Sequence, residues 1–333
     1  HKSWRMLRVC LSRGVRLSHG TAQRSRPLHL LFGTANTPHP DKKAKGGEDA
    51  FFADPAIGAF GVADGVGGSA RHGVDPGIFS RMMLSLCHRH LVENATVEPP
   101  SAAHLTRAME ASGHALERNP IGGSSTVLLG QLDGATSQLS LVNLGDSAAM
   151  VLRPSPRRFA RVGTILWPRL VARTQEQTHY FNCPYQVGSD DMRRTVREGS
   201  PDEIQVRARA GDIIVAATDG LFDNLFDEKL QQLVSAEVRN FNAPHLTSPH
   251  LSAANCLEIL SSLASAVAKE AVRVGHLQDD PATSTPFSVN AAMEGYQAPG
   301  GKLDDVAVVV GLVREGPADQ MWRGELSSNF ISK

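Results

Sequence analysis

Acidic side chains stand at the ends of several strands that the sequence predicts. They belong to Asp49, Asp64, Asp146, Asp219, Asp304 and Asp305. Because antiparallel strands end at two common edges of a sheet, these carboxylates could meet at one edge. A group of carboxylates repels itself unless some are protonated or divalent cations neutralise them. Oxygen ligands suit Mg²⁺ or Mn²⁺, whereas a zinc site would need histidine and cysteine. The pattern predicts a site for hard metal ions.

Each of these aspartates, taken alone, also fits an ordinary turn. Asp64–Gly65, Asp146–Ser147 and Asp219–Gly220 are common turn dipeptides in which the side chain caps the local backbone. A single dipeptide of this kind therefore indicates a turn rather than a metal ligand. The evidence for a site must come from the residues around the aspartates.

The elements that would position these side chains are short strands interrupted by paired helices. Strands are expected on both sides of a turn in 50–63, and then at 125–132, 138–144, 148–153, 204–208, 212–218 and 306–313. Apolar residues at helical spacing predict helices over 78–92, 102–116, 228–238 and 251–274. This order favours an α+β fold of antiparallel sheets flanked by helices. Asp146 is expected in a hairpin turn, and 277–301 is expected to be a long surface loop.

Length and composition favour one large domain preceded by a leader. The chain has 333 residues, of which 41% are hydrophobic and 20% charged, so a disordered or coiled-coil protein is excluded. No apolar run approaches the roughly 20 residues that a membrane-spanning helix needs, and no membrane span is expected.

The first 40 residues carry seven basic side chains and no acidic one, which leaves 27 basic and 34 acidic residues from Asp41 onward. A basic, acid-free N-terminus is typical of an organelle transit segment. We expect residues 1–40 to be such a leader, directing the protein to the mitochondrial matrix, with a plastid or the cytoplasm as alternatives. A disordered tail or a nucleic-acid arm has a similar composition. Because the rest of the chain is acidic, nucleic-acid binding is not expected.

Five motifs contain the acids in a fixed order along the chain. They are Gly47–Glu48–Asp49–Ala50, Val62 to Gly68, Leu144–Gly145–Asp146–Ser147, Ala217 to Asn224 and Gly301 to Val306. Together they resemble the metal-dependent serine/threonine phosphatases of the PP2C (PPM) family, over about Gly46 to Val313. Segments 73–76, 123–126 and 179–186 further resemble the PTC7-type subgroup, whose members are commonly organellar.

The resemblance implies a fold and a set of metal ligands. The fold is an αββα sandwich, two antiparallel β-sheets packed face to face with helices outside each, over residues 41–316 and followed by a C-terminal tail, 317–333. The implied cofactors are two or three Mg²⁺ or Mn²⁺ ions, with Asp64 bridging two of them. The Gly65 carbonyl would complete one of these two metals. The other implied ligands are Asp219 and Asp304 at the first metal, Glu48 and Asp49, directly or through water, at the second, and Asp146 with Asp219 at a third. Asp305 stands where many relatives have Asn, and would orient Asp304 or a bound water.

The resemblance also implies the reaction and the partners. Asp64 and Asp219 would act through a hydroxide, shared by two metals, that attacks phosphorus in line without a phosphoenzyme. The substrates would be phosphoserine and phosphothreonine proteins, and we expect the enzyme to be a monomer. The alternative function is an inactive or weakly active binding module of the same fold, which a missing ligand would favour; no ligand is missing.

Two positions depart from the family pattern. Many relatives have His directly after the bridging Asp-Gly, where this chain has Val66. His72 is the candidate general acid, although a histidine in a glycine-rich loop also fits a plain surface position. Many relatives have a phosphate-binding Arg where this chain has Ala44, and its neighbours Lys43 and Lys45 are the candidate phosphate ligands.

Overall fold

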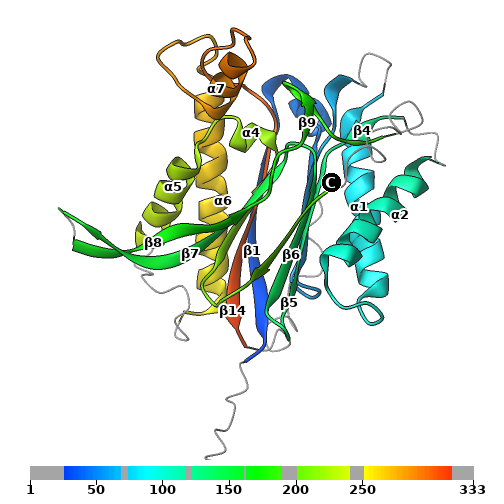
Figure 1. The fold of residues 1–333 in the computed structure, drawn as a ribbon, viewed down its shortest axis with the longest axis vertical. Helices are drawn as coiled ribbons and strands as arrows, with labels where there is room; N and C mark the ends of the chain where they lie inside the picture. The colour runs from blue at the N-terminus through cyan, green and yellow to red at the C-terminus, as the bar shows by residue number, and fades with distance from the viewer. Residues whose placement is uncertain are drawn as a thin grey trace, which may run out of the picture.

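A computed structural model describes residues 26–68, 74–117, 122–160, 163–188, 201–240 and 251–316 of the chain (Figure 1). The strands are β1 (Leu28–Thr37), β2 (Asp49–Asp54), β3 (Ala59–Asp64), β4 (Ser124–Ser125), β5 (Val127–Asp133), β6 (Gln138–Leu144), β7 (Ala148–Phe159), β8 (Gly163–Arg173), β9 (Thr178–Tyr180), β10 (Cys183–Pro184), β11 (Val187–Gly188), β12 (Asp202–Arg207), β13 (Ile213–Ala217) and β14 (Val306–Glu315). The helices are the 3₁₀ helix η1 (Pro40–Lys45), α1 (Pro76–Asn94), α2 (Ala102–Glu117), α4 (Asp219–Phe222), α5 (Asp227–Asn240), α6 (Ala253–Gly275) and α7 (Pro286–Met293).

Two five-stranded antiparallel sheets lie face to face in the middle of the molecule. One has the strand order β1-β14-β13-β7-β8 and the other the order β12-β6-β5-β3-β2. Helices α1 and α2 cover the outer face of the second sheet, and α4, α5 and α6 lie on the outer face of the first (Figure 1). The predicted αββα sandwich is therefore confirmed.

Three apolar cores hold these four layers together. The core between the sheets is built from alternate residues of both, such as Leu30, Phe60 and Ile214. The outer cores bury the opposite faces of the same strands against the helices. Helix α6 contributes a stripe of buried residues at intervals of three and four. Its backbone lies so close to β1 that a Cβ at Gly33 would be 2.2 Å from the carbonyl carbon of Leu260, so this position accepts only glycine.

Several sequence expectations need correction. The leader was expected to run to residue 40, but Leu28–Thr37 form β1, which pairs along its whole length with β14. The folded domain therefore begins before residue 41. Residues 1–25 and 317–333, which hold the rest of the expected leader and the expected tail, lie outside the described residues.

The strand pattern also differs from expectation in two places. Strand β7 continues to Phe159, and the unpredicted β8 pairs with it. The segment at Asp146 is not a hairpin turn, because β6 and β7 belong to different sheets and the chain crosses between them there. Helix α7 lies within the segment 277–301 that was expected to be loop. Within the described residues, no helix combines the length and the apolar character needed to cross a membrane.

Candidate metal centre

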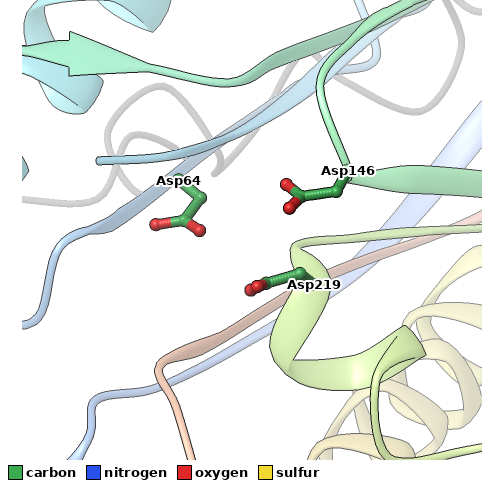
Figure 2. Close-up of side chains that lie close together, drawn as sticks. All are labelled: Asp64, Asp146 and Asp219. Carbon is green, nitrogen blue, oxygen red and sulfur yellow. The ribbon is translucent and has the colours of Figure 1, made fainter. Parts of the chain in front are cut away.

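The carboxylates converge at one end of the two sheets, as their positions at strand ends predicted. Asp64 ends β3, Asp146 lies between β6 and β7, and Asp219 begins α4 directly after β13. One carboxylate oxygen of each lies within 4.8 Å of the others. Figure 2 shows the three side chains, carried by three separate segments, pointing toward one another. Neither sheet alone could build this group, since Asp64 and Asp219 come from opposite sheets.

Asp49 lies beside this group at the start of β2. It faces Asp64 across the β2–β3 pair and is only 2% exposed. The hydroxyl of Thr218, the residue before Asp219, donates a 2.6 Å hydrogen bond to Asp49 Oδ2. The same hydroxyl accepts a hydrogen bond from the backbone N–H of Ala307 at 3.0 Å. Thr218 therefore fixes Asp49 from the other sheet.

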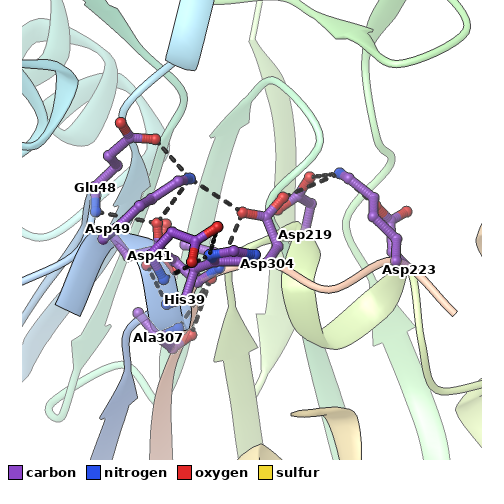
Figure 3. A network of polar contacts seen from close by, with 12 residues as sticks. His39, Asp41, Glu48, Asp49, Asp219, Asp223, Asp304 and Ala307 are labelled. Carbon is purple, nitrogen blue, oxygen red and sulfur yellow. Dashed lines mark hydrogen bonds and ion pairs between the residues drawn. The ribbon is translucent and has the colours of Figure 1, made fainter. Parts of the chain in front are cut away.

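Asp305 ties the segment before β2 to the segment before β14. Its Oδ1 accepts the backbone N–H of His39 at 2.7 Å, and its Oδ2 accepts that of Glu48 at 3.1 Å (Figure 3). The Asp305 backbone N–H in turn donates to Asp304 Oδ1 at 2.9 Å. It is thus the main chain of Asp305 that orients Asp304, while its carboxylate holds His39 and Glu48. The Asp305 carboxylate was expected to orient Asp304 or a bound water; its role toward a water stays a prediction.

Two lysines lie among the carboxylates. Lys42 Nζ is 2.6 Å from Glu48 Oε2, 3.4 Å from Asp304 Oδ1 and 3.1 Å from Asp305 Oδ2. Lys302 Nζ is 2.5 Å from Asp219 Oδ2, 2.8 Å from Asp223 Oδ2 and 3.4 Å from Asp304 Oδ2. Figure 3 labels four of the acids in these contacts, Glu48, Asp219, Asp223 and Asp304. Asp304 therefore lies between the two ammonium groups.

The main chain of Lys302 is held in place by Asn224. Asn224 Oδ1 accepts the N–H of Lys302 at 2.9 Å, and Asn224 Nδ2 donates to the carbonyl of Lys302 at 2.7 Å. Gly220 allows the same approach, since a Cβ there would lie 2.0 Å from the carbonyl oxygen of Asp305. The first turn of α4 and the segment before β14 are thus fixed against each other.

The pKa values of the carboxylates reflect their burial and their mutual repulsion. Burial and the neighbouring Asp219 carboxylate raise the pKa of Asp64 and of Asp146 well above the usual range. Burial, followed by repulsion from Asp305, does the same to the pKa of Asp49. Although burial opposes ionisation of Asp304, the ammonium groups of Lys302 and Lys42 lower its pKa. Added positive charge would therefore stabilise the ionised forms of Asp49, Asp64 and Asp146.

This donor set fits hard divalent cations. Its members are carboxylates, joined by the backbone of Gly65, whose N–H donates to the carbonyl of Glu48 at 3.1 Å. The Asp146 Oδ1 atom is buried and has no hydrogen-bond partner among the described residues. Carboxylate oxygens without hydrogen-bond donors, at raised pKa, are the ligands that Mg²⁺ or Mn²⁺ would satisfy.

Unlike the predicted metal ligands, the predicted phosphate ligands and the predicted general acid are not placed at the site by the structure. Lys43 and Lys45 are exposed on η1, whereas their neighbour Lys42 reaches the carboxylates. His72 lies outside the described residues. The sequence reasoning missed Lys42, Lys302, Asp223 and Thr218. Lys302 and Asp223 were detectable, because one stands two residues before Asp304 in the same motif and the other lies one helical turn after Asp219.

Known proteins similar to this chain carry names consistent with the site. A probable protein phosphatase 2C 55 of Arabidopsis thaliana is 36% identical over 290 residues, covering 87% of this chain and 53% of that protein. The protein phosphatase PTC7 homolog of Xenopus laevis is 33% identical over 279 residues, covering 81% of this chain and 82% of the relative. The chain thus spans about half the length of the first relative and most of the second. No model of a known protein family matches it.

A solved structure supports the same assignment. The X-ray structure of the photosystem II phosphatase PBCP matches with a TM-score of 0.65 and 27% identity, over 87% of this chain and 99% of that one. The fold, the group of carboxylates and the relatives agree, and the chain belongs to the protein phosphatase 2C family, as its motifs predicted. The Xenopus relative bears the name of the PTC7 subgroup that the finer motifs indicated.

Proposed function

We propose that this chain is a protein serine/threonine phosphatase that depends on Mg²⁺ or Mn²⁺. The observation that carries the proposal is the meeting of Asp64, Asp146 and Asp219, from three segments, with carboxylate oxygens within 4.8 Å of one another. Family membership makes phosphate-ester hydrolysis the reaction for which such a site is used. The complete set of acids argues for an active enzyme rather than a binding module.

The proposed ligands are those that the motifs indicated. Asp64 would be shared between two ions, and the carbonyl of Gly65 would complete one of them. The other ligands are Asp219 and Asp304 for one ion, Glu48 and Asp49 for the other, and Asp146 with Asp219 for a third. When bound, the ions would neutralise phosphoryl oxygens and lower the pKa of a water. The protein's part is to hold its carboxylates correctly oriented before substrate arrives.

Contacts in the structure support this positioning of the carboxylates. The Thr218 hydroxyl holds Asp49, and the Asp305 carboxylate holds the main chain of Glu48. Lys302 binds Asp219 and keeps its charge compensated. We propose Lys42, rather than Lys43 or Lys45, as the cation that meets the substrate's phosphoryl group, because its ammonium already lies at Glu48 and Asp304. His72 stays the candidate general acid.

The experiment that tests the proposal measures hydrolysis by the full chain. An aryl phosphate and a phosphothreonine peptide are offered with Mn²⁺, with Mg²⁺, and with excess chelator. Turnover with either metal, abolished by the chelator, supports the proposal. Folded protein that binds Mn²⁺ but hydrolyses neither substrate would favour a binding module of the same fold.

We further propose that the basic N-terminal residues direct the protein to the mitochondrial matrix. Support comes from composition, since the described domain begins near Leu28 and residues 1–25 have six of the seven basic residues of the expected leader and no acid. Residues 1–25 fused to a fluorescent protein test this. Matrix fluorescence is expected, and plastid or cytoplasmic fluorescence would overturn it.

A further inference from the structure

A cleft opens directly beside the candidate metal centre. It has a volume of about 500 Å³ and lies between the β9–β10 hairpin and helix α7. Figure 1 shows β9 and α7 at the same end of the molecule as α4. Asp146 and Asp223 line the cleft, and Asp146 also belongs to the group of three carboxylates. A substrate whose phosphoryl group lies at that group would therefore have neighbouring residues within reach of the cleft.

The cleft is acidic. Its lining residues include four carboxylates, those of Asp146, Glu176, Asp223 and Glu294, and no lysine or arginine among the described residues. Two of the four form ion pairs: Glu176 is 2.6 Å from Arg173, and Asp223 is 2.8 Å from Lys302. Glu294 is exposed at the end of α7 and makes no ion pair with a described residue, and Asp146 Oδ1 is buried without a hydrogen-bond partner. The cleft thus keeps the uncompensated negative charge of Glu294.

Aromatic side chains form part of its wall. Phe181 of the hairpin lies 5.2 Å from the ring of Phe287 and is stacked on Tyr296 at 5.0 Å, so the rings join the hairpin to the α7 segment. Tyr180 and Met293 add apolar surface and are 67% and 79% exposed. Aromatic faces next to carboxylates suit a long cationic side chain, whose stem packs on the rings while its charge meets the acids.

We propose that this cleft binds a lysine or arginine side chain of the substrate, a few positions from the phosphorylated residue. An extended peptide advances about 3.3–3.6 Å per residue, so a position two or three residues away can reach past Asp146 into the cleft. The inference rests on the proposed phosphatase function and adds a substrate class, namely phosphoproteins with basic residues beside the phosphorylated serine or threonine. An anionic side chain there would meet Glu294 and be repelled.

The test compares three phosphothreonine peptides of one length, with arginine, glutamine or glutamate at the positions two and three residues from the phosphate, on each side in turn. For the wild-type chain we expect kcat/KM to be about fivefold higher for the arginine peptide than for the glutamine peptide on one side, as a partly exposed ion pair would give. The glutamate peptide should be the poorest. Glu294→Lys should reduce the arginine preference and raise kcat/KM for the glutamate peptide.

A matched control separates local from general charge effects. Glu110 is an exposed acid on α2, on the opposite side of the sandwich, and Glu110→Lys makes the same change in net charge. It should leave the order of the three peptides as in the wild type. Equal kcat/KM for all three peptides, or the same shift in both variants, would overturn the inference while leaving the phosphatase function intact. Failure of the wild type to hydrolyse any peptide or an aryl phosphate would instead contradict the proposed function itself.

Discussion

Replacing Asp305 by Asn tests how the fold supports the metal centre. The Asp305 carboxylate is 1% exposed and accepts hydrogen bonds from the N–H groups of His39 and Glu48 and from the ammonium of Lys42. Asparagine keeps one oxygen and turns an NH₂ group toward donors on the other side. The variant therefore loses the hydrogen bond on the side of the NH₂ group, and the bonds on the other side lose their charged acceptor; a hydrogen bond to a charged group contributes about 1.5–3 kcal/mol.

Part of that loss is offset, because Asp305 repels Asp49 and raises its pKa. We expect a net decrease of about 2–4 kcal/mol in the free energy of unfolding, measured by urea titration in chelator. Mn²⁺ should also raise the melting temperature of Asp305→Asn less than that of the wild type, since the main chain of Glu48 loses its charged acceptor. The shift reports metal affinity through the linkage of binding to folding.

Asp212→Asn is the matched control. Asp212 is as buried as Asp305 and accepts two 2.7 Å hydrogen bonds from Arg153, but it lies at the opposite end of β13 from Asp219. This variant should lose stability while keeping the wild-type response to Mn²⁺. Unchanged stability of Asp305→Asn, or equal Mn²⁺ responses in the two variants, would refute the reasoning.

Three further changes follow from single contacts. Thr218→Val removes the hydroxyl that holds Asp49, and should weaken Mn²⁺ binding about 10–100-fold by calorimetry; unchanged affinity would contradict this role. Leu30→Ala opens the core between the sheets and should cost about 2–5 kcal/mol in urea unfolding, whereas a cost below about 1 kcal/mol would show that β1 is dispensable. Burial lowers the pKa of His104, so the unfolded state takes up its proton first as pH falls through about 6.5. Stability should then fall by up to about 1.4 kcal/mol per pH unit below 6.5, and more steeply than in His104→Leu; parallel curves would count against it.

Sequence reasoning reached most of the elements because their apolar periods are clear. Helix α6 shows the three-and-four spacing, and β13 is an unbroken apolar run ending in Asp219. Strand β1 was missed because it lies next to a basic segment whose composition suggested a leader, and only pairing with β14 shows that it belongs to the sheet. The crossing at Asp146 was taken for a hairpin because a short Gly-Asp turn looks the same whether the next strand joins the same sheet or the other one.

The site, like the fold, was predictable where it depends on local sequence and not where it depends on residues far apart in the chain. The acids themselves could be found, since each follows or precedes an apolar strand within a recognisable motif. The contacts that hold them could not, because Thr218 and Asp49 are 169 positions apart and Asp305 and Glu48 are 257 apart. Lys42 was passed over for its neighbours because a 3₁₀ helix, rather than sequence position, decides which lysine turns toward the carboxylates.

The most direct test of the central claim joins metal binding and turnover in one pair of proteins. Wild type and Asp64→Asn are titrated with Mn²⁺ by calorimetry and assayed with a phosphothreonine peptide at saturating Mn²⁺, after circular dichroism shows both folded. We expect at least two Mn²⁺ ions per wild-type chain, and in Asp64→Asn both fewer bound ions and a loss of nearly all turnover. Wild-type turnover in a folded Asp64→Asn variant, or turnover that persists in chelator, would contradict the account.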